Sequence, residues 1–77
     1  MYLTVSESGL DEMNKGTDQV AGAAIGLLAQ SDQFTPDQAV HLIVRQIPSL
    51  KVIGAKKLVQ SLYSRGYLET VQDQELF

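Results

Sequence analysis

Residues 35–69 have the sequence TPDQAVHLIVRQIPSLKVIGAKKLVQSLYSRGYLE, which contains the clearest structural signals in the chain. Thr35 is a favourable helix N-cap, Pro36 suits the first helical position, and Gln38 completes a capping box. Pro48 disfavours helical geometry at the residue before it, so the helix should stop there. The predicted apolar face comprises Ala39, Val40, Ile43, Val44 and Ile47. These signals predict a helix that begins after Thr35 and ends before Pro48.

A further helix should begin between Ser49 and Val52 and run to Arg65. Its predicted buried stripe consists of residues at helical spacing, namely Ala55, Leu58, Val59 and Leu62. Gly66 is well placed to end this helix in the left-handed conformation. Residues 67–71 then predict a short strand, which would pair with a strand at residues 2–5.

The first 34 residues contain weaker signals. Residues 6–16 are polar and predict a loop, with a helical turn as an alternative for part of it. A helix should follow with Thr17 as its N-cap and should end at residue 30 or 31. Gly22 and Gly26 lie four residues apart in this helix and predict close approach by another helix. That contact lies either inside the domain, which we favour, or across a dimer.

The composition restricts the class of protein. The chain has 77 residues, which is one domain at most, and residues 72–77 predict a flexible acidic tail. There is no cysteine, so a disulfide or thiolate metal site is excluded. No apolar run is long enough for a membrane span, and the first residues do not resemble a signal peptide. We therefore expect a small acidic cytoplasmic protein with no membrane partner, no bound metal and no cofactor.

The net charge of −3 conceals an uneven distribution of charge. Residues 1–37 contain six acids and one base, whereas residues 38–68 contain five bases and no acid. Three further acids follow in residues 69–77. An acid-free stretch inside an acidic protein is the most unusual feature of this sequence and suggests a function.

The segment 39–69 resembles the helix-turn-helix core of winged-helix domains. The resemblance is carried by Leu58 and by Leu62-Tyr63-Ser64-Arg65-Gly66-Tyr67-Leu68-Glu69, which end a helix and enter a strand. Two features depart from the family pattern. The turn at residues 47–51 is longer and more apolar than usual, and too few residues follow Glu69 for a two-stranded wing, so a wing would need the N-terminal strand.

The fold class that follows is mainly α: a three-helix, helix-turn-helix-like bundle with a two-stranded β-ribbon formed by the terminal segments. A plain three-helix bundle with a small ribbon is the alternative. A homodimer is also expected, because a short chain with small residues on its first helix can complete its core by pairing.

The last predicted helix is the best candidate for function. Opposite its buried stripe lie basic and polar residues of the types that contact phosphates and base edges, namely Lys56, Lys57, Gln60, Ser61 and Ser64. The candidate binding residues are Arg45, Lys51, Lys56, Lys57, Gln60, Ser64 and Arg65, of which Arg45, Lys51 and Arg65 would contact phosphates. An ordinary solvated helix face is the alternative interpretation.

Two functions are compatible with this face. The first is a small regulatory DNA-binding module that acts in transcription. The second is an adaptor or inhibitor module that docks a larger transcription or replication protein and does not bind nucleic acid. Enzymatic activity is not expected. Asp37, His41 and Arg45 share one helix face, but an exposed ladder of favourable pairs explains them better than a histidine base does.

The segment 72–77 ends in Leu76-Phe77. Two apolar residues after a polar acidic stretch could dock into the groove of a partner. The alternative, which we favour, is that they fold back onto the domain itself.

Overall fold

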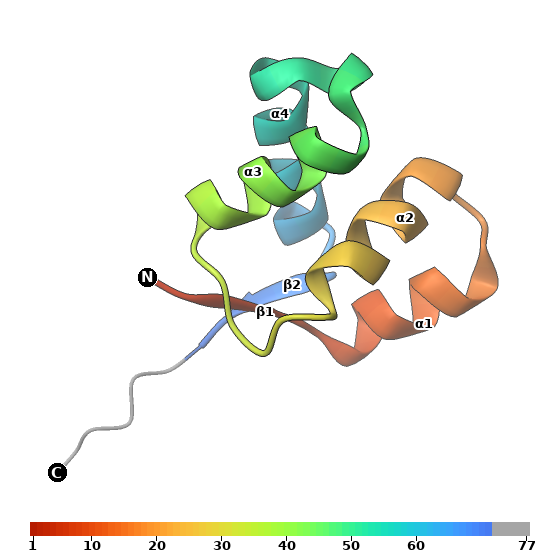
Figure 1. Ribbon diagram of the computed structural model, residues 1–77. Helices are drawn as coiled ribbons and strands as arrows, with labels where there is room; N and C mark the ends of the chain where they lie inside the picture. Colours follow the sequence, from red (N-terminus) through yellow and green to blue (C-terminus); the bar gives the residue numbers. More distant parts are fainter. Residues whose placement is uncertain (72–77) are drawn as a thin grey trace, which may run out of the picture.

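The computed structural model describes residues 1–71, and this part of the chain is mainly helical, with a small antiparallel sheet (Figure 1). Its elements are β1 (Leu3–Val5), α1 (Glu7–Lys15), α2 (Gln19–Leu28), α3 (Pro36–Gln46), the 3₁₀ helix η1 (Pro48–Leu50), α4 (Lys51–Ser64) and β2 (Leu68–Thr70). The mainly helical class is confirmed, but the prediction of three helices is wrong. The tail predicted for residues 72–77 lies outside the described residues.

The additional helix is α1, at the residues for which a loop was predicted. Ser6 is its N-cap, and the Ser6 Oγ accepts a hydrogen bond from the Gly9 N–H at 3.1 Å. Glu7 in the first turn and Lys15 in the last turn have the charges that favour the helix dipole. Gly16 ends the helix with a φ of 67°. Local signals for a helix were therefore present, although few apolar residues accompany them.

The start of α1 packs closely against the chain that leads into β2. The Ser6 N–H donates to the Tyr67 carbonyl oxygen at 2.9 Å, and the Ser6 hydroxyl donates to the Gly66 carbonyl oxygen at 2.6 Å. A Cβ atom on Gly9 would overlap the Tyr67 carbonyl oxygen and would lie 2.9 Å from Val5 Cγ1. Gly9 is therefore required for this contact, which its place in the sequence alone does not reveal.

The boundaries of α2 differ slightly from the prediction. Its N-cap is Asp18, whose carboxylate accepts a hydrogen bond from the Ala21 N–H at 3.1 Å, so the predicted cap Thr17 is one residue too early. The helix ends at Leu28, two or three residues before the predicted end. Contacts on either side place α2 between α1 and α3 (Figure 1).

The terminal segments form the predicted ribbon. β1 and β2 are antiparallel, with Leu3 opposite Thr70 and Val5 opposite Leu68. On its other side Leu3 forms a β-bridge with Phe34, through backbone hydrogen bonds of 2.7 and 3.0 Å. The N-terminal strand therefore lies between β2 and the segment that precedes α3. The pairing of β1 with β2 is the one predicted between the terminal segments.

Both ends of the segment that contains α3 and α4 have the predicted capping geometry. The Thr35 and Gln38 side chains each accept a hydrogen bond from the other's backbone N–H, at 3.1 and 2.9 Å, before α3. After α4, the Tyr67 N–H donates to the Leu62 carbonyl at 2.9 Å, and the Gly66 N–H donates to the Tyr63 carbonyl at 3.0 Å. Gly66 has a φ of 84°, so these bonds form a Schellman motif.

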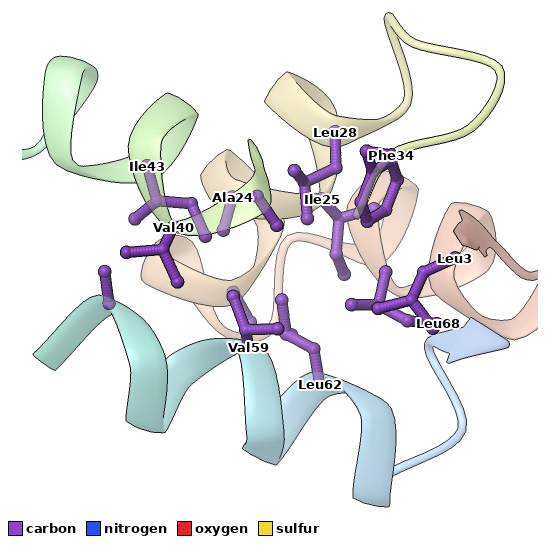
Figure 2. Close-up of a cluster of buried hydrophobic side chains, with 13 residues drawn as sticks. Leu3, Ala24, Ile25, Leu28, Phe34, Val40, Ile43, Val59, Leu62 and Leu68 are labelled. Atoms are coloured by element: carbon purple, nitrogen blue, oxygen red, sulfur yellow. The ribbon is translucent and has the colours of Figure 1, made fainter. Parts of the chain in front are cut away.

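The core lies between α2, α3, α4 and the sheet. Figure 2 shows Val59 and Leu62 of α4 pointing toward the cluster that includes Val40 and Ile43 of α3. The buried apolar residues are Leu3, Ala21, Ala24, Ile25, Leu28, Phe34, Ala39, Val40, Ile43, Ala55, Val59, Leu62 and Leu68. Most of both predicted stripes is buried, whereas Val44, Ile47 and Leu58 are half-buried. This packing fixes the outward face of α4.

Candidate functional site

The outward face of α4 is set by the residues that the helix buries. Ala55, Val59 and Leu62 face the core. An exposed row runs along the opposite side at spacings of four, three and four residues, and its members are Ile53, Lys57, Gln60 and Ser64. Lys56 is exposed on the flank of this row. We call these five residues the α4 face; four of them are predicted binding residues.

The other predicted binding residues lie apart from one another. Arg45 is exposed in the last turn of α3, Lys51 is the first residue of α4, and Arg65 follows the last residue of α4. A helix of 14 residues is ~21 Å long, so Lys51 and Arg65 are at opposite ends of the site. The seven predicted residues therefore form a central group of four with three flanking cations.

Arg65 has several partners within the protein. Its Nη1 lies 3.6 Å from the Asp18 Oδ2, and its Nε donates to the Ser61 Oγ at 3.2 Å. Its guanidinium carbon lies 5.4 Å from the centroid of the Tyr67 ring. These contacts connect the end of α4 to the N-cap of α2. Arg65 thus has a structural role that the sequence pattern did not indicate.

Asp18 is the carboxylate whose titration these contacts change. The hydrogen bond from the Ala21 N–H lowers the pKa of Asp18, and the nearby Arg65 guanidinium lowers it further. Both side chains are 41% exposed, so the ion pair itself contributes little to stability. The negative charge of Asp18 nevertheless offsets part of the positive charge that Arg65 adds to the site.

A groove runs beside the α4 face, between α4 and the start of α3. Its larger part is a hollow of about 470 Å³ lined by Met1, Leu3, Pro36, Val59, Gln60, Tyr63 and Ser64. A smaller hollow of about 190 Å³ is lined by Pro36, Asp37, Val40, Lys56, Val59 and Gln60. The two hollows share Pro36, Val59 and Gln60, so we treat them as one α3/α4 groove.

The α3/α4 groove is mostly apolar. Leu3 and Val59 form part of its floor and are 2% and 6% exposed, whereas Tyr63 stands at its side and is 47% exposed. The Tyr63 hydroxyl lies 3.1 Å from the Thr70 Oγ1, so the end of β2 is beside the groove. Sequence patterns did not predict this groove, because it requires the N-terminal strand to lie against α4.

No protein-family model, curated protein or solved structure matches this chain. Function is therefore inferred from the α4 face and the α3/α4 groove alone.

The first turn of α4 exposes two apolar side chains. Ile53 is 71% exposed and Val52 is 52% exposed. Neither residue belongs to the stripe that the sequence predicts to be buried. Large contiguous patches of exposed apolar surface mark interaction sites. The α4 face is thus apolar at its start and basic and polar along the rest.

The histidine that was weighed as a general base lies at the surface of α3. Asp37, His41 and Arg45 are all exposed on α3. Within residues 1–71, no group of three or more histidines and acids is placed to hold a metal ion. In the same part of the chain, no helix has the length and apolar character needed to cross a membrane.

Proposed function

We propose that this protein is a small regulatory DNA-binding module of helix-turn-helix type, with α4 as the helix that contacts DNA. The observation that carries the proposal is the shared exposure of Lys57, Gln60 and Ser64 along one side of α4, with Lys56 next to them. Lysine is suited to phosphates, and glutamine and serine can bond base edges. No acid is present on α4 to oppose an approaching phosphate.

The packing of α4 supports this assignment. α3 and the core lie behind α4, so its opposite face is free to approach a partner. The major groove of B-DNA is about 12 Å wide and admits one α-helix. Arg45 and Lys51 flank the junction between α3 and α4, where a phosphate backbone could be contacted in addition.

The acidic remainder of the chain affects how the module would bind. With a net charge of −3, the chain has no general attraction for nucleic acid, so binding depends on the orientation of the α4 face. Two copies would double the number of cations that meet the duplex. The expected homodimer and a cytoplasmic location are therefore part of this proposal, as is a role in transcription regulation.

Fluorescence anisotropy with a labelled duplex of mixed sequence, repeated across salt concentrations, tests the proposal. Neutralising ~4 phosphates predicts a slope of about −4 in log affinity against log salt. Lys57→Glu should weaken binding and reduce the slope by about 1. Lys15→Glu on α1 is the matched control, since it makes the same change in net charge away from α4. Equal losses in both variants would mean that net charge, rather than the α4 face, determines binding.

A second function is favoured by one specific observation, the exposure of Val52 and Ile53 at the start of α4. In this alternative, the protein docks a larger transcription or replication protein and does not contact nucleic acid. A tagged protein would then retain its partner after nuclease treatment. Ile53→Asp on α4 should release that partner without unfolding the protein. Val20→Asp, at an exposed apolar position on α2, should leave the partner bound.

A further inference from the structure

The exposed row of α4 contains one residue that phosphate contacts do not explain. Ile53 is 71% exposed, and it has no group that can bond a phosphate. Its exposure to water is unfavourable in the free protein. We propose that Ile53 and Gln60 together recognise A·T base pairs in the major groove, where Ile53 packs on the C5-methyl group of a thymine and the Gln60 amide bonds an adenine. This recognition rests on the proposed function, because it requires α4 to enter the groove of a duplex.

Ile53 and Gln60 lie on the same side of α4. They are seven residues apart, and two helical turns leave such a pair within ~20° of alignment. Both side chains are exposed. Val59 and Leu62 point the other way, into the core, which fixes the rotation of the helix (Figure 2). A duplex that approaches one of the two exposed residues therefore approaches both.

The spacing of the two residues matches a short step along the duplex. Seven residues advance ~10.5 Å along a helix axis. Successive bases of one strand are ~3.4 Å apart, so with the helix along the groove the two contacts fall ~3 base pairs apart. The major groove is ~12 Å wide and ~8.5 Å deep, which is enough to admit the helix. Ile53 and Gln60 can thus contact two base pairs of one short site.

The chemistry of the two side chains matches the groups that an A·T pair presents in the major groove. Thymine has its methyl group there, and adenine presents the N7 acceptor and the N6 donor. A glutamine amide contains both donors and an acceptor, so Gln60 can bond both adenine groups at once. Contact between Ile53 and the methyl group removes apolar surface from water on both sides. A G·C pair has neither the methyl group nor the N6 donor.

The charges around these residues favour the approach of a duplex. Lys56 and Lys57 are exposed and lie between Ile53 and Gln60 in the sequence. The acid that faces this part of α4 across the smaller hollow is Asp37 of α3, so the two lysines leave an excess of positive charge. Their attraction to phosphates is the same for every DNA sequence. Discrimination between bases is therefore left to Ile53 and Gln60.

Duplexes that differ by one chemical group test the contact of Ile53. Fluorescence anisotropy compares a labelled duplex of alternating A and T with the same duplex in which uracil replaces thymine, a change that removes only the methyl groups. Burial of one such group changes an equilibrium ~4-fold, so the wild type should bind the thymine duplex ~4-fold more tightly. Ile53→Ala should bind both duplexes equally. Val20→Ala, which truncates an exposed β-branched side chain on α2, should keep the wild-type difference.

The contact of Gln60 is tested with a duplex in which 7-deazaadenine replaces adenine. This change removes the N7 acceptor, and the wild type should lose ~5-fold in affinity with that hydrogen bond. Gln60→Ala should bind the two duplexes equally. Gln19→Ala, at an exposed glutamine that begins α2, should lose as much as the wild type. All four variants replace exposed residues, so circular dichroism should show the wild-type helix content and stability for each.

The outcomes distinguish this recognition from DNA binding itself. If the wild type bound the thymine and uracil duplexes equally, or if Ile53→Ala kept the difference, the contact with thymine would be overturned while α4 remained a DNA-binding helix. The same holds for Gln60 and the adenine contact, and failure of either contact overturns joint recognition. Absence of binding to every duplex at low salt would reject both the recognition and the proposed function, and would leave Ile53 to a protein partner.

Discussion

Replacing Gly9 with alanine should destabilise the protein, although alanine is the better residue for a helix. The added methyl group would overlap the Tyr67 carbonyl oxygen and crowd Val5 Cγ1. Hydrogen bonds hold both neighbours in place. The Tyr67 carbonyl oxygen accepts a hydrogen bond from the Ser6 N–H, and Val5 lies in the sheet opposite Leu68. The clash can be relieved only by moving α1 away from the end of α4.

The magnitude follows from three contributions. Overpacking of this kind costs ~1–3 kcal/mol. Separation of α1 would also weaken the two hydrogen bonds that Ser6 makes to residues 66 and 67, each of which contributes ~1 kcal/mol. Higher helix propensity offsets at most ~1 kcal/mol. We expect a net loss of ~2 kcal/mol, which in a domain of this size lowers the melting temperature by ~10 °C.

Thermal and urea unfolding, followed by far-UV circular dichroism, measures this loss. Gly22→Ala is the matched control, because a Cβ atom at Gly22 would meet no atom within 4 Å. That variant should be more stable than the wild type by up to ~1 kcal/mol. If Gly9→Ala melted at or above the wild-type temperature, the close packing of α1 on the Gly66–Tyr67 backbone would be refuted.

Three further predictions concern helix ends. Lys51 has a φ of 62° and a ψ of 177°, which is a strained backbone conformation for a residue other than glycine. Lys51→Gly should therefore raise the unfolding free energy by ~1 kcal/mol in urea titrations. An equal gain in Lys51→Ala would contradict the strain. Thr35→Ala should cost ~1 kcal/mol in the same assay through loss of the cap, and an unchanged midpoint would count against the capping box. The pKa of Asp18 is lower in the folded protein than in the unfolded chain, so its carboxylate adds stability. This contribution is present at pH values above the unfolded-state pKa of about 3.9 and is lost as the pH falls through the folded-state pKa. In acid melts, Asp18→Asn, which retains a capping oxygen, should therefore lose less stability than the wild type, and parallel pH profiles would exclude this contribution.

Sequence signals predicted the second half of the fold well, because local chemistry determines it. The Thr35 capping box, the Pro48 stop and the Gly66 end of α4 each depend on a few neighbouring residues. A loop was predicted where the structure has α1, and the reason for this error is a tertiary contact. Gly9 weakens the helical pattern in the sequence, yet it is the residue that lets the helix pack against Tyr67.

In the candidate site, too, local signals predicted some features and contacts between distant segments were missed. Helical periodicity was sufficient to predict that Lys56, Lys57, Gln60 and Ser64 are exposed, and the structure has them exposed on α4. The α3/α4 groove and the contacts of Arg65 could not be predicted in this way. They depend on how segments distant in sequence meet, namely the N-terminal strand beside α4 and the start of α2 beside its end.

The most direct measurement of the central claim is a titration of the ¹⁵N-labelled protein with a mixed-sequence duplex, followed by amide chemical shifts. If α4 contacts DNA, the largest shifts should occur at Lys56, Lys57, Gln60 and Ser64 and should diminish as salt is added. Amides of α1, on another part of the molecule, should change little. Absence of any shift at low salt, or salt-dependent shifts confined to α1 and α2, would contradict the assignment of α4 as the DNA-binding helix.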